Sequence, residues 1–309
     1  MTEFIKNTAL KIGFDACGIA KADFLNEDAG FMKTWLGNGF HGEMGYLERN
    51  FDKRTDPTLL VEGCKSIIIT LMNYFPAEFQ AVDAPKISKY AYSRIDYHTV
   101  MREKLEMLEN RIKDEFGESC FNADQQHRFV DSAPVLERQW AVKAGLGWIG
   151  KNKMLINPVL GSFCFIGVIL INKELEYDKP IKDHCGTCRK CLDACPTGAL
   201  TENAGLDARK CISYQTIEKK DEIAKEIQSK LSGYAYGCDI CNDVCPWNRT
   251  RAKANSHKEF EPLNEIIGWN IDEWDNLTQK EFKLIFKNSA IQRAGYMKLK
   301  QNIELLKRN

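Results

Sequence analysis

The chain has 309 residues, 44% of them hydrophobic, and its 43 basic and 43 acidic side chains cancel to a formal net charge of zero. A chain of this length usually holds about two domains, and the balanced charge excludes a global positive field that would attract nucleic acid, so such contact needs a local patch. The N-terminus is too polar for a secretory signal, and the longest apolar stretch, Ser162 to Ile171, is about half of the ~20 residues that a membrane helix needs. A cytoplasmic protein without a membrane segment is predicted.

The spacing of apolar residues predicts the elements of the first third of the chain. Residues 2–12 have helical spacing, and residues 13–20 form a turn that leads into a short strand. A second helix is expected around residues 31–37, followed by a polar surface segment over residues 41–57. Residues 64–72 are apolar and β-branched, which predicts a buried central strand.

Helix signals recur in the middle of the chain. Helical spacing over residues 105–116 predicts a long helix. A short strand then ends at Asp131, and the next helix is expected over residues 135–145. Ser132 is its predicted N-cap, and Pro134 is expected in its first turn.

The composition changes after another apolar run at residues 162–171, which is a second predicted buried strand. Beyond it the chain becomes rich in cysteine and charge, so a domain boundary is expected near residues 172–183. Residues 217–232 are predicted to form a charged, solvated helix. After Pro246 we expect a basic loop and two amphipathic helices.

Eight of the twelve cysteines lie between Cys185 and Cys245. The first run, CGTCRKCLDACP, has the C-x2-C-x2-C-x3-C-P spacing, in which three thiolates bind one 4Fe-4S cluster and the fourth binds another. The second run, CDICNDVCP, matches the last three cysteines of this motif, and Ala235 stands in place of the first. Cys211, between the runs, is the natural replacement.

The spacing therefore predicts two 4Fe-4S clusters with four ligands each. One is held by Cys185, Cys188, Cys191 and Cys245, and the other by Cys195, Cys211, Cys238 and Cys241. Zinc is the alternative, because paired C-x2-C units also form tetrahedral sites, but both x3-C-P endings are typical of ferredoxins. Disulfides are disfavoured in a cytosolic chain. The remaining cysteines, Cys17, Cys64, Cys120 and Cys164, are predicted to be small buried residues.

Residues 145–151, GLGWIGK, match the G-x-G-x-x-G fingerprint and nearly match the Walker pattern. A dinucleotide loop follows a strand and opens a helix, whereas here a predicted helix precedes the glycines and a strand follows them. Asn152 also stands where the Walker pattern requires Ser or Thr. We interpret the glycines as the end of a helix, where they let the backbone pass close to a large group.

Because a two-cluster module transfers only single electrons, the first domain must either hold an electron acceptor or dock one. Asp131 lies at a strand end among apolar residues, where burial would raise the pKa of its carboxyl group toward the range of a general acid. The structural alternative is that Asp131 only caps the helix at Ser132. His98 similarly has a structural reading as a histidine in the first turn of a helix.

Several blocks of the sequence together resemble the epoxyqueuosine reductase family of tRNA-modifying, cobalamin-dependent iron-sulfur enzymes. The ferredoxin spacing is shared with many proteins, but the VDSAPVLER and GLGWIGKN blocks beside it are specific to this family. The blocks span nearly the whole chain: DYH from Asp96, VDSAPVLERQWAVKAGLGWIGKNKMLINPVLGSF from Val130, the first cysteine run, CISYQTIEKK from Cys211, and GCDICNDVCPWN from Gly237.

The resemblance implies an α+β fold with three parts. These are an N-terminal α/β sandwich that binds cobalamin (1–175), a ferredoxin-like domain with two 4Fe-4S clusters (176–255), and a short helical C-terminus (256–309). It further implies that the clusters reduce the cobalt and that epoxyqueuosine in a tRNA anticodon is converted to queuosine. Longer members carry a C-terminal helical-repeat domain, so we expect a short form that ends before it. We also expect a monomer that receives electrons from an external donor of the flavodoxin or ferredoxin type.

The same resemblance assigns roles to individual residues. Asp131 is implied to be the proton donor to the epoxide oxygen. The implied cobalamin contacts are Arg54, Arg94, Tyr97, His98, Asp131, Lys151 and Asn152, together with Ser213 and Asp239 beside cluster ligands. For tRNA we expect docking on one of two basic segments, Arg249, Arg251, Lys253 and Lys258, or Arg293, Lys298, Lys300, Lys307 and Arg308, although such runs are often only a solvated helical face.

Three other functions stay open at this point. A ferredoxin-like electron carrier would contain iron and sulfide but no corrinoid. A related corrinoid reductase of a small halogenated compound would typically carry an export signal. A zinc-stabilised nucleic-acid-binding module would show no redox activity.

Overall fold

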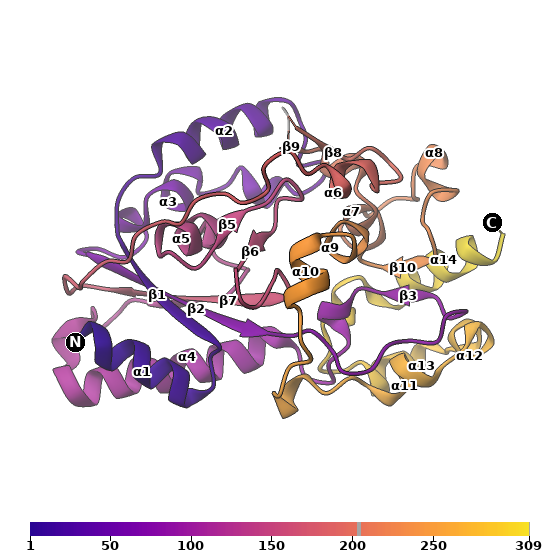
Figure 1. Cartoon of the computed structure of the whole chain (residues 1–309). Helices are drawn as coiled ribbons and strands as arrows, with labels where there is room; N and C mark the ends of the chain where they lie inside the picture. The colour runs from indigo at the N-terminus through magenta and orange to yellow at the C-terminus, as the bar shows by residue number, and fades with distance from the viewer. Residues whose placement is uncertain (203–204, 309) are drawn as a thin grey trace. The chain divides into compact units, whose positions relative to one another are not determined.

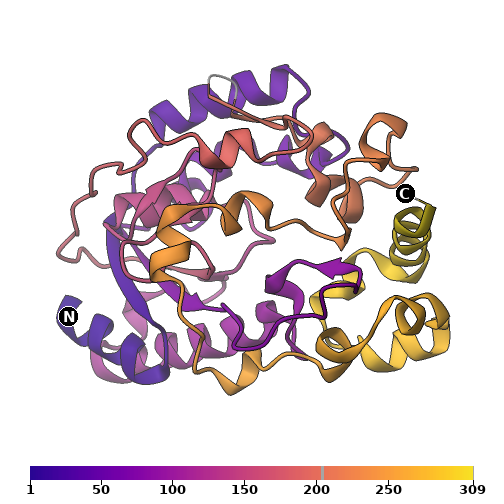
Figure 2. The same cartoon turned by 45° about the vertical axis from the view of Figure 1, so that its right-hand side comes forward.

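The computed structural model describes residues 1–202 and 205–308 (Figures 1 and 2). The chain divides into two compact units. Unit 1 contains Met1–Asn38, Gly45–Asn73 and His98–Thr187, and unit 2 contains Gly39–Met44, Tyr74–Tyr97 and Cys188–Asn309. Two short segments that precede the cysteine-rich region in the sequence therefore group with it, and the boundaries at residues 175 and 255 stay predictions.

Unit 1 is built on a four-stranded antiparallel sheet in the order β1-β2-β7-β4. Its strands are β1 (Ala16–Lys21), β2 (Ser66–Asn73), β7 (Cys164–Ile171) and β4 (Arg128–Phe129). The two central strands, β2 and β7, pair from Ser66 with Ile171 to Asn73 with Cys164. Every residue of β2 is buried, as its continuous apolar run predicts for a strand that is covered on both faces. The predictions of two buried strands are confirmed.

Helices cover both faces of this sheet (Figure 1). α1 (Thr2–Ile12) and α4 (Tyr97–Phe116) lie on one side, and α5 (Glu137–Lys143), α3 (Phe51–Thr55) and α2 (Asn26–Gly37) lie on the other. Trp140 and Ala141 of α5 are fully buried in the core that this side forms with the strands. α1 is confirmed at its predicted bounds. α2 begins earlier than predicted because its first turn is polar and lacks the apolar spacing that marks a helix in the sequence. α4 also begins earlier, at Tyr97, and its buried Val100 and Met101 extend the apolar spacing that was predicted only from Leu105.

The prediction for the start of α5 is wrong. Its N-cap is Leu136 rather than Ser132, and Pro134 lies before the helix. Residues 130–135 instead form two tight turns, in which Ser132 N–H donates to the Val130 carbonyl at 2.6 Å and Val135 N–H donates to the Ala133 carbonyl at 2.8 Å. Three-residue turns need backbone angles outside the helical range at their central residues, here Asp131 and Pro134, so the helix begins only after them.

Unit 2 contains short elements around the two cysteine runs. The strands are β3 (Lys86–Ile87), which pairs parallel with β10 (Tyr234–Tyr236), and β8 (Leu200–Thr201), which pairs antiparallel with β9 (Gly205–Leu206). The helices here are α6 (Lys190–Asp193), α7 (Ile212–Ile217), α8 (Lys225–Gln228), α9 (Ile240–Asp243) and α10 (Pro246–Arg251).

A continuous helix over residues 217–232 is not formed. α7 ends at Ile217, and only Lys225–Gln228 resume a helix. The Glu43 carboxylate accepts the Lys220 N–H at 2.9 Å and pairs with the Lys219 ammonium at 3.2 Å. This tertiary contact takes a backbone donor that a helix would use internally, so the prediction is wrong for a reason that lies far away in the sequence.

The C-terminal part of unit 2 has four α-helices rather than the predicted two. They are α11 (Asn264–Gly268), α12 (Ile271–Asn276), α13 (Gln279–Ile285) and α14 (Gly295–Arg308). Trp274 and Phe286 are fully buried and stack with ring centroids 5.9 Å apart. Nowhere in the described part of the chain is a helix both long and apolar enough to cross a membrane.

Candidate active site and cluster-binding cysteines

Asp131 stands at the apex of the turn between β4 and α5, with φ at +54°. The bond from Ser132 N–H to the Val130 carbonyl spans this residue, which makes a three-residue turn with a positive φ at its centre. Turns of this kind are rare and strained for residues other than glycine, although aspartate tolerates the left-handed region better than most. The backbone therefore presents the Asp131 side chain in an unusual direction.

The structure brings two predicted site residues together in unit 1. His98, near the start of α4, places Nε2 3.4 Å from Oδ2 of Asp131. The Asp131 side chain is 57% exposed and that of His98 is 18% exposed. The expected burial of Asp131 is therefore wrong, because the tight turn lifts the residue away from the apolar side chains that flank it in the sequence.

The carboxyl group that burial does perturb belongs to Glu137. This half-buried residue opens α5, and its Oε1 accepts the backbone N–H of Asp131 at 2.5 Å. Burial, with the neighbouring Asp131 charge, raises the pKa of Glu137 to about 8. Sequence reasoning missed Glu137, although it lies within the VDSAPVLER block and an acidic residue in the first turn of a helix is a readable signal.

Arg54 lies on the other side of the same turn. The residue is 8% exposed, its Nη1 donates to the Ala133 carbonyl at 3.4 Å, and its Nη2 donates to the Tyr46 carbonyl at 3.4 Å. Within the described residues, the buried Nε finds no acceptor. A buried guanidinium N–H without an acceptor is a donor that a bound group would satisfy.

The glycine-rich segment is a hairpin and not a nucleotide loop, in line with our interpretation. Gly145, with φ at +70°, follows the end of α5, and β5 (Trp148–Ile149) pairs antiparallel with β6 (Leu155–Ile156). A side chain on Gly147 would lie 2.3 Å from the Ile156 carbonyl oxygen. The close approach that requires glycine here is therefore made by the hairpin itself.

Lys151 and Asn152 lie in the turn of this hairpin. Asn152 is buried, and its Oδ1 accepts the Met154 N–H at 3.2 Å. The Cys185 thiol lies beside the backbone N–H of Lys151 and the indole of Trp148, which partly offset the effect of burial that raises its pKa. Donors of this kind stabilise a thiolate.

In unit 2, four of the predicted ligands lie close enough to act on one another. Burial raises the pKa of Cys241, and the neighbouring Cys238 and Cys211 raise it further. Burial also raises the pKa of Cys238, with contributions from Cys211 and Cys195. The smaller part of these shifts, which comes from the neighbouring cysteines, marks a place where bound iron would neutralise charge.

The pKa of Cys195 is shifted in the opposite direction to the pKa values of Cys238 and Cys241. Burial opposes its ionisation, but the Thr197 hydroxyl and the N–H groups of Leu200, Ala199 and Thr197 together lower the pKa of its thiol. Among the described residues no three His, Cys, Asp or Glu side chains converge on a single metal ion. In a cubane the four thiolates bind four separate irons, so they do not converge on one point.

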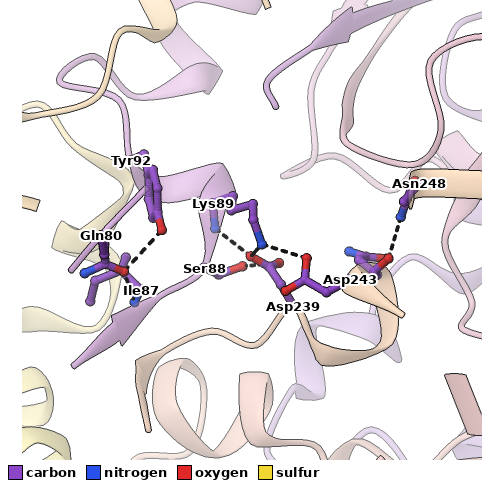
Figure 3. A network of polar contacts seen from close by, with 9 residues as sticks. Gln80, Ile87, Ser88, Lys89, Tyr92, Asp239, Asp243 and Asn248 are labelled. Atoms are coloured by element: carbon purple, nitrogen blue, oxygen red, sulfur yellow. Dashed lines mark hydrogen bonds and ion pairs between the residues drawn. The ribbon is translucent and has the colours of Figure 1, made fainter. Parts of the chain in front are cut away.

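Asp239, next to Cys238, ties two segments of unit 2 together (Figure 3). Its Oδ1 accepts the Ser88 hydroxyl at 2.6 Å, and its Oδ2 accepts the Lys89 N–H at 2.8 Å. The Lys89 ammonium lies 3.5 Å from Asp239 and 2.7 Å from Asp243. The buried Asp239 carboxylate thus fixes the segment around Ser88 to the second cysteine run.

The other predicted contacts are spread over unit 2. Arg94 is exposed, and the Tyr97 ring meets the Tyr90 ring edge to face at 6.1 Å. Ser213 is half-buried, and its backbone N–H faces the Cys211 thiol.

The two basic segments differ in the exposure and in the partners of their side chains. Arg293 pairs with Glu218 at 2.6 Å, Lys300 pairs with Asp275 at 2.9 Å, and Lys307 pairs with Asp275 at 2.5 Å. Lys298 is buried and donates to the Asp221 carbonyl at 3.0 Å. By contrast, the other segment, on α10 and the chain that follows it, is exposed at all four positions, Arg249, Arg251, Lys253 and Lys258.

Comparison with known proteins identifies the family. The family model described as "Epoxyqueuosine reductase QueG, DUF1730" matches residues 54–132, and the one described as "4Fe-4S double cluster binding domain" matches residues 184–248. The epoxyqueuosine reductase of Cellulophaga algicola is 48% identical over 306 residues, which cover 99% of this chain and 98% of that protein.

Solved structures agree with this match. A crystal structure of epoxyqueuosine reductase with an epoxyqueuosine-modified tRNA-Tyr stem loop is 32% identical with a TM-score of 0.86, covering 98% of this chain and 80% of that one. The Bacillus subtilis enzyme, in a structure whose catalytic aspartate loop is swung out of the active site, is 32% identical with a TM-score of 0.83 and the same coverage. The expectation drawn from the sequence blocks is confirmed: the chain belongs to the epoxyqueuosine reductase family.

Proposed function

We propose that this protein reduces epoxyqueuosine to queuosine in tRNA. The observation that carries the proposal is the 48% identity to an epoxyqueuosine reductase over 99% of the chain. The reaction removes the epoxide oxygen: two electrons and two protons enter, two C–O bonds break, a C=C bond forms, and one water leaves. The protein must therefore supply electrons at one place and a proton at the epoxide oxygen.

The donor sets fit the cofactors that this chemistry needs. Seven of the eight cysteines lie in unit 2 and one in unit 1, and the mutual influence of four thiolates suits iron-sulfur clusters, which supply single electrons. The buried, unsatisfied Nε of Arg54 suits a group rich in oxygen acceptors, such as the amide side chains of cobalamin. Reduced cobalamin supplies a strong nucleophile for a strained epoxide carbon. Its contacts would come from Arg54, Arg94, Tyr97, His98, Lys151, Asn152, Ser213 and Asp239.

Asp131 acts in this proposal as the acid that protonates the epoxide oxygen. Its exposed carboxyl group can take a new proton from solvent after each turnover. The nearby His98 ring, 3.4 Å from Oδ2, holds the side chain in place and stabilises the carboxylate that remains after proton transfer. Asp131 and His98, both in unit 1, are thus the proposed proton donor and the side chain that supports it.

For the substrate, we place tRNA contact on the exposed basic segment of α10 and the chain after it. A positive charge that is already paired with a carboxylate gains less from a phosphate, which disfavours the paired residues near α14. We further propose a cytoplasmic monomer that receives electrons from a donor of the flavodoxin or ferredoxin type.

The decisive experiment is an anaerobic reconstitution with iron, sulfide and cobalamin, followed by an assay on tRNA that carries epoxyqueuosine. We expect stoichiometric cobalamin with a protein-bound cobalt(II) EPR signal, and queuosine as the product. Clusters without cobalamin and without product would instead favour an electron carrier. Turnover of a halogenated small molecule, but not of the tRNA, would favour the other corrinoid reductase.

A further inference from the structure

The turn that carries Asp131 is fastened to the helix that follows it. Asp131 N–H donates to Oε1 of Glu137 at 2.5 Å, and Glu137 is the first residue of α5. One turn further on, Trp140 and Ala141 anchor α5 in the core of unit 1, with 1% and 0% exposure. The Glu137 carboxyl group therefore connects the exposed turn to a rigid, buried element.

The conformation of the turn needs such a connection. A residue other than glycine at a φ of +54° persists only where its surroundings hold it there. The bond from Ser132 N–H to the Val130 carbonyl closes the turn but leaves the Asp131 N–H to be satisfied by another group. Glu137 supplies that acceptor, and we call this contact the latch.

The surroundings of the latch are charged on several sides. His98 and Arg138 act favourably on the Glu137 carboxylate, and Asp131 acts unfavourably. Arg54 lies near both carboxylates and holds the far side of the turn through the Ala133 carbonyl at 3.4 Å. A carboxyl oxygen accepts a hydrogen bond whether the group is protonated or ionised, so the contact from the Asp131 N–H to Oε1 does not require a charge on Glu137.

We propose that Glu137 is a positioning residue for the reaction: it accepts the Asp131 N–H and so keeps the Asp131 side chain in the orientation from which it protonates the substrate. Glu137 acts through the backbone of Asp131 and not on the substrate. The inference rests on the proposed function for its chemical role, whereas the latch itself is measured independently of turnover.

The test uses full-length protein with both kinds of cofactor and three variants. E137A removes the acceptor, E137Q keeps an oxygen that accepts the same N–H, and Q139A is the matched control two residues later on the same helix. Amide hydrogen exchange of a peptide covering residues 129–137 reports the latch. Steady-state kinetics on tRNA report kcat and KM separately, and iron and cobalamin contents report whether each variant is intact.

For E137A we expect faster exchange in this peptide and a kcat lower by about 100-fold with KM nearly unchanged, because a misplacement of the acid by about 1 Å has an effect of this size. E137Q should keep the slow exchange and most of kcat. Q139A should match the wild type in both measurements.

Three outcomes would overturn the inference. Wild-type exchange in E137A means that the latch does not hold the turn. Faster exchange with wild-type kcat means that the latch does not position Asp131. An E137Q variant with slow exchange but as inactive as E137A assigns the effect to the charge or proton of Glu137 instead. If the wild type fails to reduce the epoxide, the proposed function fails, and the exchange data still decide whether Glu137 holds the turn.

Discussion

At the scale of single residues, three side chains of unit 1 divide the tasks of one site. Asp131 is exposed and close to His98, while Glu137 is half-buried and bonded to the Asp131 backbone. Exposure suits a carboxyl group that must exchange protons with solvent, and burial suits one that holds a fixed contact. This difference follows from the tight turn at Asp131, which leaves the Asp131 side chain exposed while its backbone N–H donates to Glu137.

Replacing Asp131 by asparagine tests the acid directly. Asparagine also tolerates a positive φ, so the turn should survive and both cofactors should bind. Loss of the proton donor should lower turnover by about 10²- to 10⁴-fold, measured as queuosine formed under single-turnover conditions. S132A is a suitable control, because Ser132 contributes its backbone N–H to the turn. Full activity in D131N would refute the acid role.

The raised pKa of Glu137 predicts how stability depends on pH. The folded protein holds the Glu137 proton up to a pKa of about 8, whereas an unfolded chain releases it near the ordinary glutamate pKa of 4.5. This contribution to stability is therefore complete below about pH 4.5 and is lost as the pH rises to about 8. E137Q does not titrate, so its stability relative to the wild type should increase between pH 5 and pH 8. Denaturant unfolding of both proteins at several pH values measures the difference, and a difference that is independent of pH would contradict the assignment.

At the scale of elements, the connections between helices and strands determine the site. α5 begins late, at Glu137, and ends at Lys143, two residues before Gly145, so the helix is short and a turn of the site lies at each end. The Asp131 turn precedes it, and the hairpin with Lys151 and Asn152 follows it. Sequence periodicity identified the helix but not the two turns that define its length.

Gly145 should be intolerant of substitution. Its φ is +70°, and an added Cβ would lie 2.7 Å from the Lys179 carbonyl oxygen. Gly295 has a φ of +76° at the start of α14, with open space around a Cβ, so G295A measures the backbone strain alone. We expect G295A to lower the free energy of unfolding by about 1 kcal/mol and G145A by more, about 2–4 kcal/mol. Equal losses in the two variants would show that the contact with Lys179 is relieved at no cost.

The exposed basic segment of α10 predicts how tRNA affinity depends on salt. Each phosphate contact that is removed should reduce the slope of log K against log salt concentration by about 0.7–0.9. Replacing Arg249 and Arg251 by alanine should therefore weaken tRNA binding and flatten this slope. K300A/K307A is the matched control, because both lysines pair with Asp275. An equal effect of the two double variants would argue against a docking role for α10.

At the scale of the whole molecule, the predicted cysteine ligands are divided between two compact units. Cys185 belongs to unit 1, and the other seven predicted ligands belong to unit 2. The segments Gly39–Met44 and Tyr74–Tyr97 join unit 2 from earlier in the sequence. Of these, the second brings Ser88 and Lys89 to Asp239 beside the second cysteine run.

The ligand sets predict the iron content of cysteine variants. Wild-type protein should bind about eight irons per chain, and C211S should keep about four, because it removes one ligand from only one cluster. C120A should keep about eight, since Cys120 is a buried residue outside both ligand sets. Iron and sulfide analysis after anaerobic reconstitution measures this, and zinc in place of iron in the wild type would refute the cluster assignment.

The sequence by itself determined the features that depend on local spacing. The cysteine runs, the buried strands and the family blocks were all readable, because ligand spacing and apolar runs are properties of adjacent residues. The capping boxes at Asn270 and Thr278, which begin α12 and α13, are local N-x-x-E and T-x-x-E signals of the same kind, although the prediction of two C-terminal helices did not use them.

Only the tertiary structure decided the features that depend on contacts between distant residues. The contact of Glu43 with the Lys220 N–H prevented a continuous helix after Ile217. The ion pairs of Lys300 and Lys307 with Asp275 distinguished the basic segment that contains these paired lysines from the basic segment that is exposed at all four positions. The strained turn exposed Asp131 and gave the buried contact to Glu137. Periodicity records which residues are apolar, but it does not record which partner satisfies a given polar group, and that choice is made only when the chain is folded.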